Sequence, residues 1–158
     1  MYSVLVILHI LAAVTWVGGM IFLSLVLAPL VRSRKAAPEF MALFRSAALR
    51  FRPIVWVAIA ILLATGPMLL SLRGILATSP AAWPVIVTVK LTLVFLLLCM
   101  TVLHDLVLGP RISRVSAIPE SQRTTGEQVV FRTARWLPRL SLLIALAVVI
   151  AASSLARS

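Results

Sequence analysis

The stretch SVLVILHILAAVTWVGGMIFLSLVLAP, residues 3–29, decides the fold of this 158-residue chain. It contains no Asp, Glu, Lys or Arg, and His9 is its only ionisable side chain. At about 1.5 Å per residue, a helix of this length can cross a hydrocarbon core about 30 Å thick. We therefore predict a transmembrane helix from about Ser3 to Ala28, ended by Pro29.

The rest of the chain repeats this apolar pattern three more times. Apolar residues make up 62% of the sequence and gather in blocks, with the charged residues between them. An unpaired charge at the bilayer centre costs about 2.5–3.5 kcal/mol on insertion scales, which explains the segregation. We predict an all-α fold, an up-down four-helix bundle within the membrane that forms a single domain over residues 1–158. Its spans cover about residues 3–28, 54–72, 84–108 and 138–156.

The basic residues indicate how the chain is threaded. In a soluble protein a formal net charge of +11 would suggest nucleic acid. Here the Lys and Arg residues lie beside long apolar blocks, so lipid headgroups and topology explain them and we exclude nucleic acid. The loops at 30–52 and 109–137 are rich in Lys and Arg, whereas the loop at 73–83 and both termini are poor in them. We predict a multi-pass protein of a bacterial-type inner (plasma) membrane with both termini outside.

The two basic loops also contain apolar residues at helical spacing. Phe40, Phe44 and Phe51 follow this spacing in the first loop, and Pro38-Glu39 is a suitable start for a helix. The end of the second loop, Glu127–Leu137, has a similar pattern. We predict short interfacial helices in both loops. We find no internal repeat, although each half follows the same plan of helix, basic loop and helix.

Two ionisable side chains inside the spans stand out. His9 and Lys90 each lie about six residues into a predicted helix. In an up-down bundle these helices run parallel, so both groups would lie at one depth, roughly 9 Å below the outer end. A neutral imidazole is a common metal ligand, and a desolvated lysine can act as a base or an amine ligand. The alternatives are a core histidine bonded to a carbonyl or hydroxyl and a lysine that snorkels to the surface.

The first helix presents a stripe of large residues beside the histidine. At 100° per residue, Trp16 and Met20 fall within about 20° of His9. This stripe could line a cofactor slot, with His9 and Met20 as metal ligands, but such a stripe is also common in plain helix packing. Gly18 and Gly19 would allow a neighbouring helix to approach closely.

His104 and Asp105 form a second polar position near the predicted cytoplasmic end of the third helix. Asp105 could pair with Arg50 or Arg52, which begin the second span at the same predicted level. Alternatively, His104 could contact a metal or a haem propionate. His9 and His104 are about 20 Å apart along the axis by helix rise, so they cannot share one metal ion.

Several stretches resemble one membrane family in order and spacing. Residues 9–20, HILAAVTWVGGM, look like the first-helix signature of copper-resistance protein D (CopD-like) membrane proteins. Residues 50–52 followed by 65–66 look like the second-helix pattern, and residues 89–91, VKL, like a third-helix element. Residues 104–111, HDLVLGPR, are similar to the ending of short stand-alone members. The resemblance implies copper handling.

The pattern is also similar to that of the HemJ-type protoporphyrinogen oxidases. That resemblance implies haem b binding, with roles for the positions of His9 and Lys90. The stretch Ala28–Arg32 stands where that family has an extended motif with a further histidine.

Three functional hypotheses follow. The first is a copper-handling membrane protein with a site around His9, since imidazole and thioether ligands suit copper. The second is a haem b protein or oxidoreductase that uses His9 with Lys90, Trp16 or His104. The third is a structural subunit that packs against a larger membrane protein or a second copy of itself. We identify no catalytic residues, because the sequence has no nucleophile elbow and no phosphate-binding loop.

Overall fold

The computed structural model describes residues 1–32, 38–115, 122 and 124–155. All its regular elements in these ranges are helices, and four of them are long and apolar enough to cross a membrane: Tyr2–Leu30, Ala42–Leu72, Val85–Ile112 and Trp136–Ser154. The predicted all-α membrane class is therefore confirmed. Arg34, Lys35 and Arg123, which contributed to the topology prediction, lie outside the described residues.

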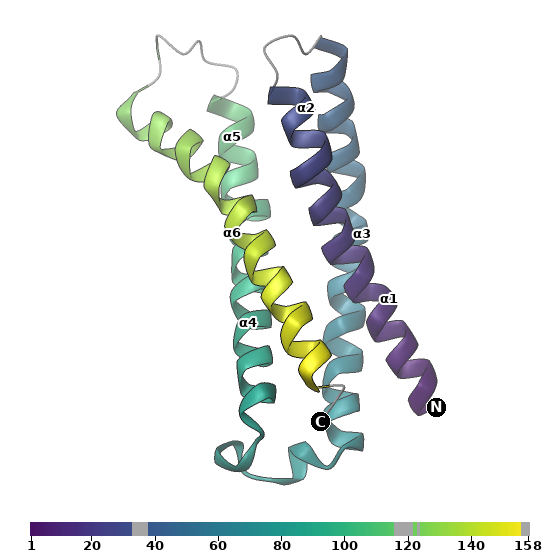
Figure 1. The fold of residues 1–158 in the computed structure, drawn as a ribbon. Coiled ribbons are helices and arrows are strands. Elements are labelled where there is room, and N and C mark those ends of the chain that lie inside the picture. Colours follow the sequence, from purple (N-terminus) through teal and green to yellow (C-terminus); the bar gives the residue numbers. More distant parts are fainter. Residues whose placement is uncertain (33–37, 116–121, 123, 156–158) are drawn as a thin grey trace. The chain divides into compact units, whose positions relative to one another are not determined.

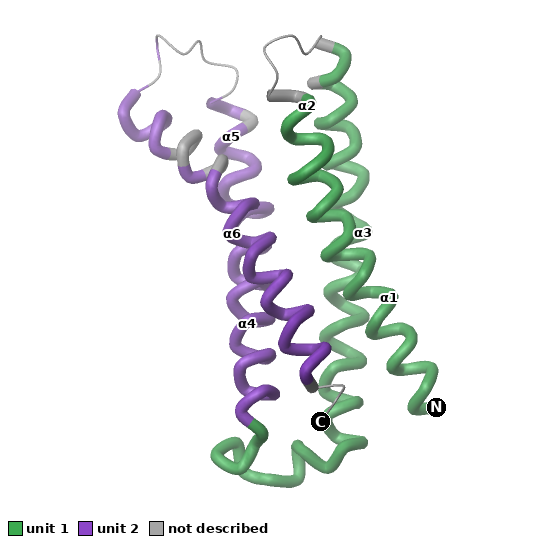
Figure 2. The backbone as a smooth tube through the Cα atoms, viewed as in Figure 1, with its two compact units in different colours: residues 1–84 green, residues 85–158 purple. Residues whose placement is uncertain are grey.

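The chain divides into two compact units, Met1–Pro84 and Val85–Ser158, coloured separately in Figure 2. Each unit contributes two of the four candidate spans, so each is a helical hairpin.

Unit 1 opens with a helix that changes its winding before it ends. It comprises α1 (Tyr2–Ile21), the π-helical segment η1 (Phe22–Leu27) and α2 (Ala28–Arg32). The predicted end at Pro29 is wrong, because the helix continues past this residue. In an α-helix the proline ring clashes with the carbonyl four residues earlier. The π-helical turns just before Pro29 are wider, as the bond from the Ala28 N–H to the Leu23 carbonyl shows, and they accommodate the ring.

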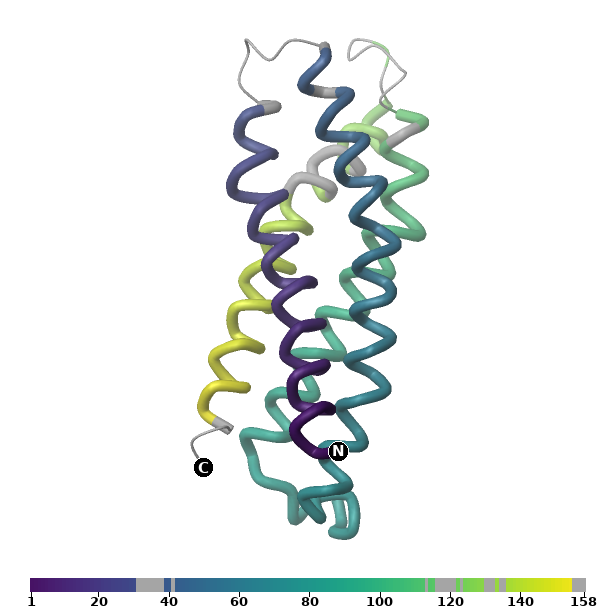
Figure 3. Tube along the Cα trace, turned by 90° about the vertical axis from the view of Figure 1, so that its right-hand side faces the viewer, coloured from purple at the N-terminus to yellow at the C-terminus, as the bar shows by residue number. Residues whose placement is uncertain are grey.

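The second helix of unit 1, α3 (Pro38–Leu72), runs without interruption through Pro53. The separate interfacial helix predicted in the first loop is therefore wrong, since those residues form the first turns of α3. Proline favours the start of a helix, but tertiary contacts can override this preference. Here α1 and α2 both pack along α3, and Figures 1 and 3 show them side by side.

A compact turn closes unit 1 after α3. Gly74 has φ of 73°, in the left-handed region that glycine adopts readily. The 3₁₀ segments η2 (Ile75–Ala77) and η3 (Pro80–Ala82) follow, and the Trp83 Nε1–H donates to the Thr78 carbonyl over 3.3 Å. This hydrogen bond ties the indole ring to the backbone of the turn.

Unit 2 has a similar order of elements. Its first helix comprises α4 (Val85–Val102), the π-helical segment η4 (Leu103–Leu108) and α5 (Gly109–Val115), so the predicted end at Gly109-Pro110 is also wrong. Its second helix, α6 (Thr125–Leu155), continues through Pro138 and absorbs the second predicted interfacial helix. The Thr124 Oγ1 and the Glu127 carboxylate each accept a backbone N–H of the other residue, which caps the start of α6.

Candidate functional site

The polar centre of unit 1 is a contact between His9 on α1 and Thr65 on α3. The His9 Nδ1 lies 2.8 Å from the Thr65 Oγ1. The Thr65 hydroxyl donates its single proton to the Ile61 carbonyl, over 2.7 Å. The hydroxyl can therefore only accept from the imidazole, which assigns the proton of neutral His9 to Nδ1 and the lone pair to Nε2.

The surroundings of this pair hold the ring in place. Thr65 is 5% exposed, while His9 is half-buried. The next residue, Gly66, packs beside the ring, because a Cβ at that position would lie 3.6 Å from the His9 Cε1. At the start of α1 the Arg73 guanidinium donates to the Tyr2 hydroxyl over 3.5 Å, so this contact joins the start of α1 to the residue that follows α3. His9 is seven residues further along α1, about 10 Å away by helix rise.

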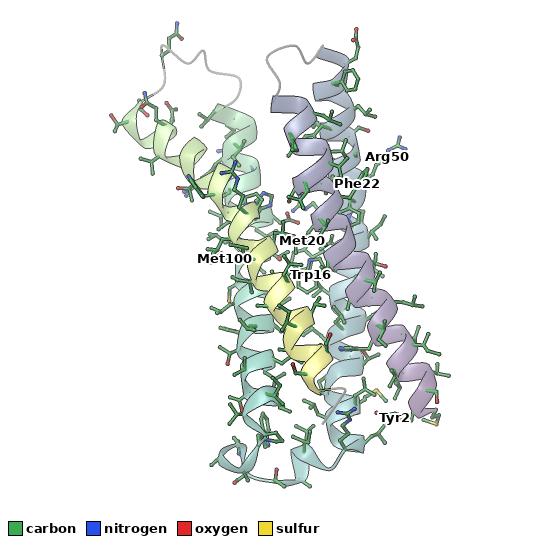
Figure 4. All side chains as sticks on the ribbon, in the orientation of Figure 1. Tyr2, Trp16, Met20, Phe22, Arg50 and Met100 are labelled. Atoms are coloured by element: carbon green, nitrogen blue, oxygen red, sulfur yellow. The ribbon has the colours of Figure 1, made fainter. Side chains whose placement is uncertain are left out.

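The stripe predicted on α1 separates into two kinds of residue. Trp16 is 3% exposed, and the buried residues of the neighbouring helix α3 include Val55, Ala58 and Ile59. Met20 is half-buried; Figure 4 labels both side chains. Trp16 is thus a buried residue, and its place in a cofactor slot remains a prediction.

Met20 and His9 cannot hold one ion together. They are eleven residues apart on the continuous helix α1, so their Cα atoms are about 16 Å apart by helix rise. A metal–nitrogen or metal–sulfur bond is about 2.0–2.3 Å long. Any role of Met20 in copper handling would be at a separate position.

The two glycines of α1 differ sharply. A Cβ at Gly19 would overlap the ring of Phe51 from α3, whereas one at Gly18 would meet no described atom within 4 Å. Gly19 thus allows the close helix approach that the sequence predicted for the pair, and Gly18 does not take part.

The other sequence-predicted residues lie in unit 2. Lys90 is half-buried on α4. In η4 the His104 Nδ1 lies 3.3 Å from the Asp105 Oδ1, and His104 is the more exposed of the two side chains. A carboxylate beside one ring nitrogen is a common way to orient a metal-binding histidine. A pocket shared by His9 and Lys90, and a pairing of Asp105 with Arg50 or Arg52, remain predictions, because each would join the two units.

The donor set limits which metal could bind. Within the described part of the chain, no three His, Cys, Asp or Glu side chains gather in a way that could hold an ion. A neutral imidazole with its lone pair on Nε2 fits Cu(I) or haem iron, each of which accepts a histidine with few other protein ligands.

The sequence pattern did not identify Thr65 as the partner of His9. Thr65 was one of several hydroxyls within the spans, and no spacing rule pairs residues on two helices. The antiparallel contacts of Tyr2 with Arg73 and of Gly19 with Phe51 set the register that brings Thr65 to the imidazole.

Comparison with known proteins agrees with this membrane architecture. The family model described as Copper resistance protein D matches residues 45–155, well over half of the chain. The matched range includes Thr65, Lys90 and His104, whereas His9 precedes it. None of the curated proteins and none of the solved structures compared with the chain matches it. On the family match, the chain belongs to the copper resistance protein D family.

Proposed function

We propose that this protein handles copper in the membrane and that His9 binds Cu(I) on the outward half of unit 1. The family description supports copper as the cargo. The observation that carries the proposal is the pair of hydrogen bonds at Thr65. The Thr65 hydroxyl donates to the Ile61 carbonyl and accepts the Nδ1–H of His9, so the lone pair of the imidazole is on Nε2. Imidazole nitrogen and thioether sulfur are ligands that suit copper.

Thr65 serves as the positioning residue in this proposal. It holds the imidazole in one tautomer and one orientation, so the nitrogen that binds the cation is set before the ion arrives. Hydrogen bonds of this kind to a ligating histidine typically contribute about 10–100-fold to metal affinity. The burial of Thr65 keeps water from competing for the Nδ1–H.

Met68 is the thioether best placed to serve as a second ligand. It follows Thr65 by three residues on α3, about 4.5 Å along the axis and 60° around it. Its side chain is partly exposed, and side chains on a helix lean toward the preceding turn, which here is the turn of Thr65. Met20, by contrast, is about 16 Å from His9 along α1.

Cu(I) titration of the full chain in detergent against a chromophoric chelator tests the proposal. We expect His9→Ala to abolish tight binding and Thr65→Val to weaken it by about 10–100-fold, whereas Thr65→Ser keeps the acceptor and the affinity. Met68→Leu should weaken binding as well. His104→Ala is the matched control, because it removes a histidine from the other unit. Equal affinity of wild type and His9→Ala would contradict the proposal.

Haem b is the second candidate, because the same His9 tautomer suits an axial ligand. Bound haem would supply redox chemistry at its iron, while His9 would hold the group and Thr65 would orient the ring. An absorption spectrum of protein purified from haem-replete cells separates the two functions. A Soret band that disappears in His9→Ala supports haem, and a colourless preparation that binds Cu(I) supports copper.

A further inference from the structure

The first helices of the two units have the same irregular architecture at the same spacing. Each is an α-helix interrupted by a six-residue π segment, Phe22–Leu27 in one and Leu103–Leu108 in the other, 81 residues apart. Pro29 and Pro110 follow these segments at the same place and are also 81 residues apart. A π segment is rare, and two of equal length in equal positions indicate a common origin for the two helices.

The pattern of buried and exposed residues in these two helices also repeats after 81 residues. Between Leu5 and Ala28, every buried or half-buried residue except Ile21 has a buried or half-buried counterpart 81 residues later, and the reverse also holds. The best-buried pair is Trp16, 3% exposed, and Leu97, 1% exposed. Burial follows the helical period in any two packed helices. Here the buried positions of the two helices also stay aligned with each other on both sides of the π segments, which the helical period alone does not require.

The second helices agree more loosely. α3 and α6 are both long and carry an internal proline, Pro53 and Pro138, 85 residues apart. Their buried residues repeat at 86 instead, and Thr65 then corresponds to Ala151. Each unit also turns over in a basic loop, so by the charge rule both hairpins start on the same side of the membrane.

We infer that the chain is a tandem repeat of one helical hairpin and that position 90 is the second copy of the ligand position occupied by His9. His9 and Lys90 are 81 residues apart, on matching faces, at matching distances from the π segments. The first copy presents an imidazole there and the second presents an amine. Parallel repeats of this kind are a known plan of membrane transport proteins.

The copies have diverged at their polar and small residues. Unit 2 has Met100 where unit 1 has Gly19, and Asp105 where unit 1 has Ser24. Substitutions of this kind remove sequence similarity while the helix geometry persists. This divergence explains why the sequence showed no internal repeat.

Moving the histidine from position 9 to position 90 by mutation tests the inference. This experiment rests on the proposed copper function. In the full chain, His9→Ala should lose Cu(I) binding, and His9→Ala with Lys90→His and Ala151→Thr should regain at least a tenth of the wild-type affinity. The matched control is His9→Ala with Val89→His and Ala151→Thr, because Val89 is an exposed neighbour of Lys90. A folded transfer variant that binds no better than this control overturns the ligand position.

A second measurement tests the repeat without copper. Spin labels are placed on cysteines at lipid-facing pairs 81 residues apart, Val14 with Phe95 and Leu25 with Leu106, in a Cys99→Ala background in bilayers. Accessibility to oxygen and to a water-soluble nickel chelate reports depth. We expect the two members of each pair to lie within one helical turn in depth. A larger difference in depth within either pair overturns the repeat. Absence of Cu(I) binding by the wild-type protein, with the depths as expected, contradicts only the proposed function.

Discussion

The contact between Gly19 and Phe51 allows a sharp test of the packing of unit 1. A methyl group at position 19 would overlap the Phe51 ring, whereas the same group at Gly18 would meet no described atom within 4 Å. Gly19→Ala and Gly18→Ala therefore make the same chemical change on adjacent residues of one helix. Only the first should disturb the interface between α1 and α3.

The difference between these variants isolates the packing term. Replacing glycine by alanine inside a helix gains up to about 1 kcal/mol, and this gain is common to both variants. Overfilling a packed interface costs about 1–3 kcal/mol. We therefore expect Gly19→Ala to be about 1–3 kcal/mol less stable than Gly18→Ala, about 5- to 140-fold in the ratio of folded to unfolded protein.

Reversible unfolding of the full chain in mixed detergent, followed by circular dichroism, measures this difference. Phe51→Ala combined with each glycine variant completes the cycle, and the penalty at position 19 should shrink once the ring is gone. Equal stability of Gly19→Ala and Gly18→Ala would contradict this close contact, and so would a penalty that stays unchanged when the Phe51 ring is removed.

Three further predictions concern other contacts. Thr65→Val should destabilise the protein by about 1–3 kcal/mol relative to Thr65→Ser, because it removes the acceptor of the His9 N–H, and equal melting of the two variants in detergent would contradict this. Thr124→Ala should cost about 1 kcal/mol at the start of α6 and speed amide exchange there, and unchanged exchange would argue against the cap. The Arg139 guanidinium lies 5.0 Å from the ring centroid of Trp136, where the fourth candidate span begins, so we expect Trp136 to lie near the lipid headgroups. In a variant whose only tryptophan is Trp136, lipids brominated near the headgroup should therefore quench the tryptophan fluorescence more than lipids brominated deep in the acyl chains. Stronger quenching by the deep bromines would place Trp136 away from the interface.

Much of the fold could be predicted from the apolar blocks. The four candidate spans follow from length and hydropathy, because a helix satisfies the backbone hydrogen bonds of a long apolar run within that one segment. The helix ends could not be predicted, since the local preference of proline pointed to breaks at Pro29, Pro53, Pro110 and Pro138. The structure passes through all four, two of them after π segments and two inside long helices.

The candidate site was predictable only in part. His9 stood out because an ionisable group within a span is costly and needs a reason. Its partner could not be predicted, because Thr65 is 56 residues away and its choice depends on how α1 and α3 align. The angular match of His9 and Met20 along α1 left out their axial separation of about 16 Å, so the two predicted metal ligands cannot share one ion.

By itself, the sequence determined the class of this protein, a helical membrane protein, because hydrophobic length and the placement of charge are local properties of the chain. It also marked the residues that could carry chemistry. Only the tertiary structure decided which hydroxyl lies against His9 and which of the two glycines of α1 lies against Phe51. These depend on the register of the antiparallel helices, which arises from contacts between residues far apart in the chain.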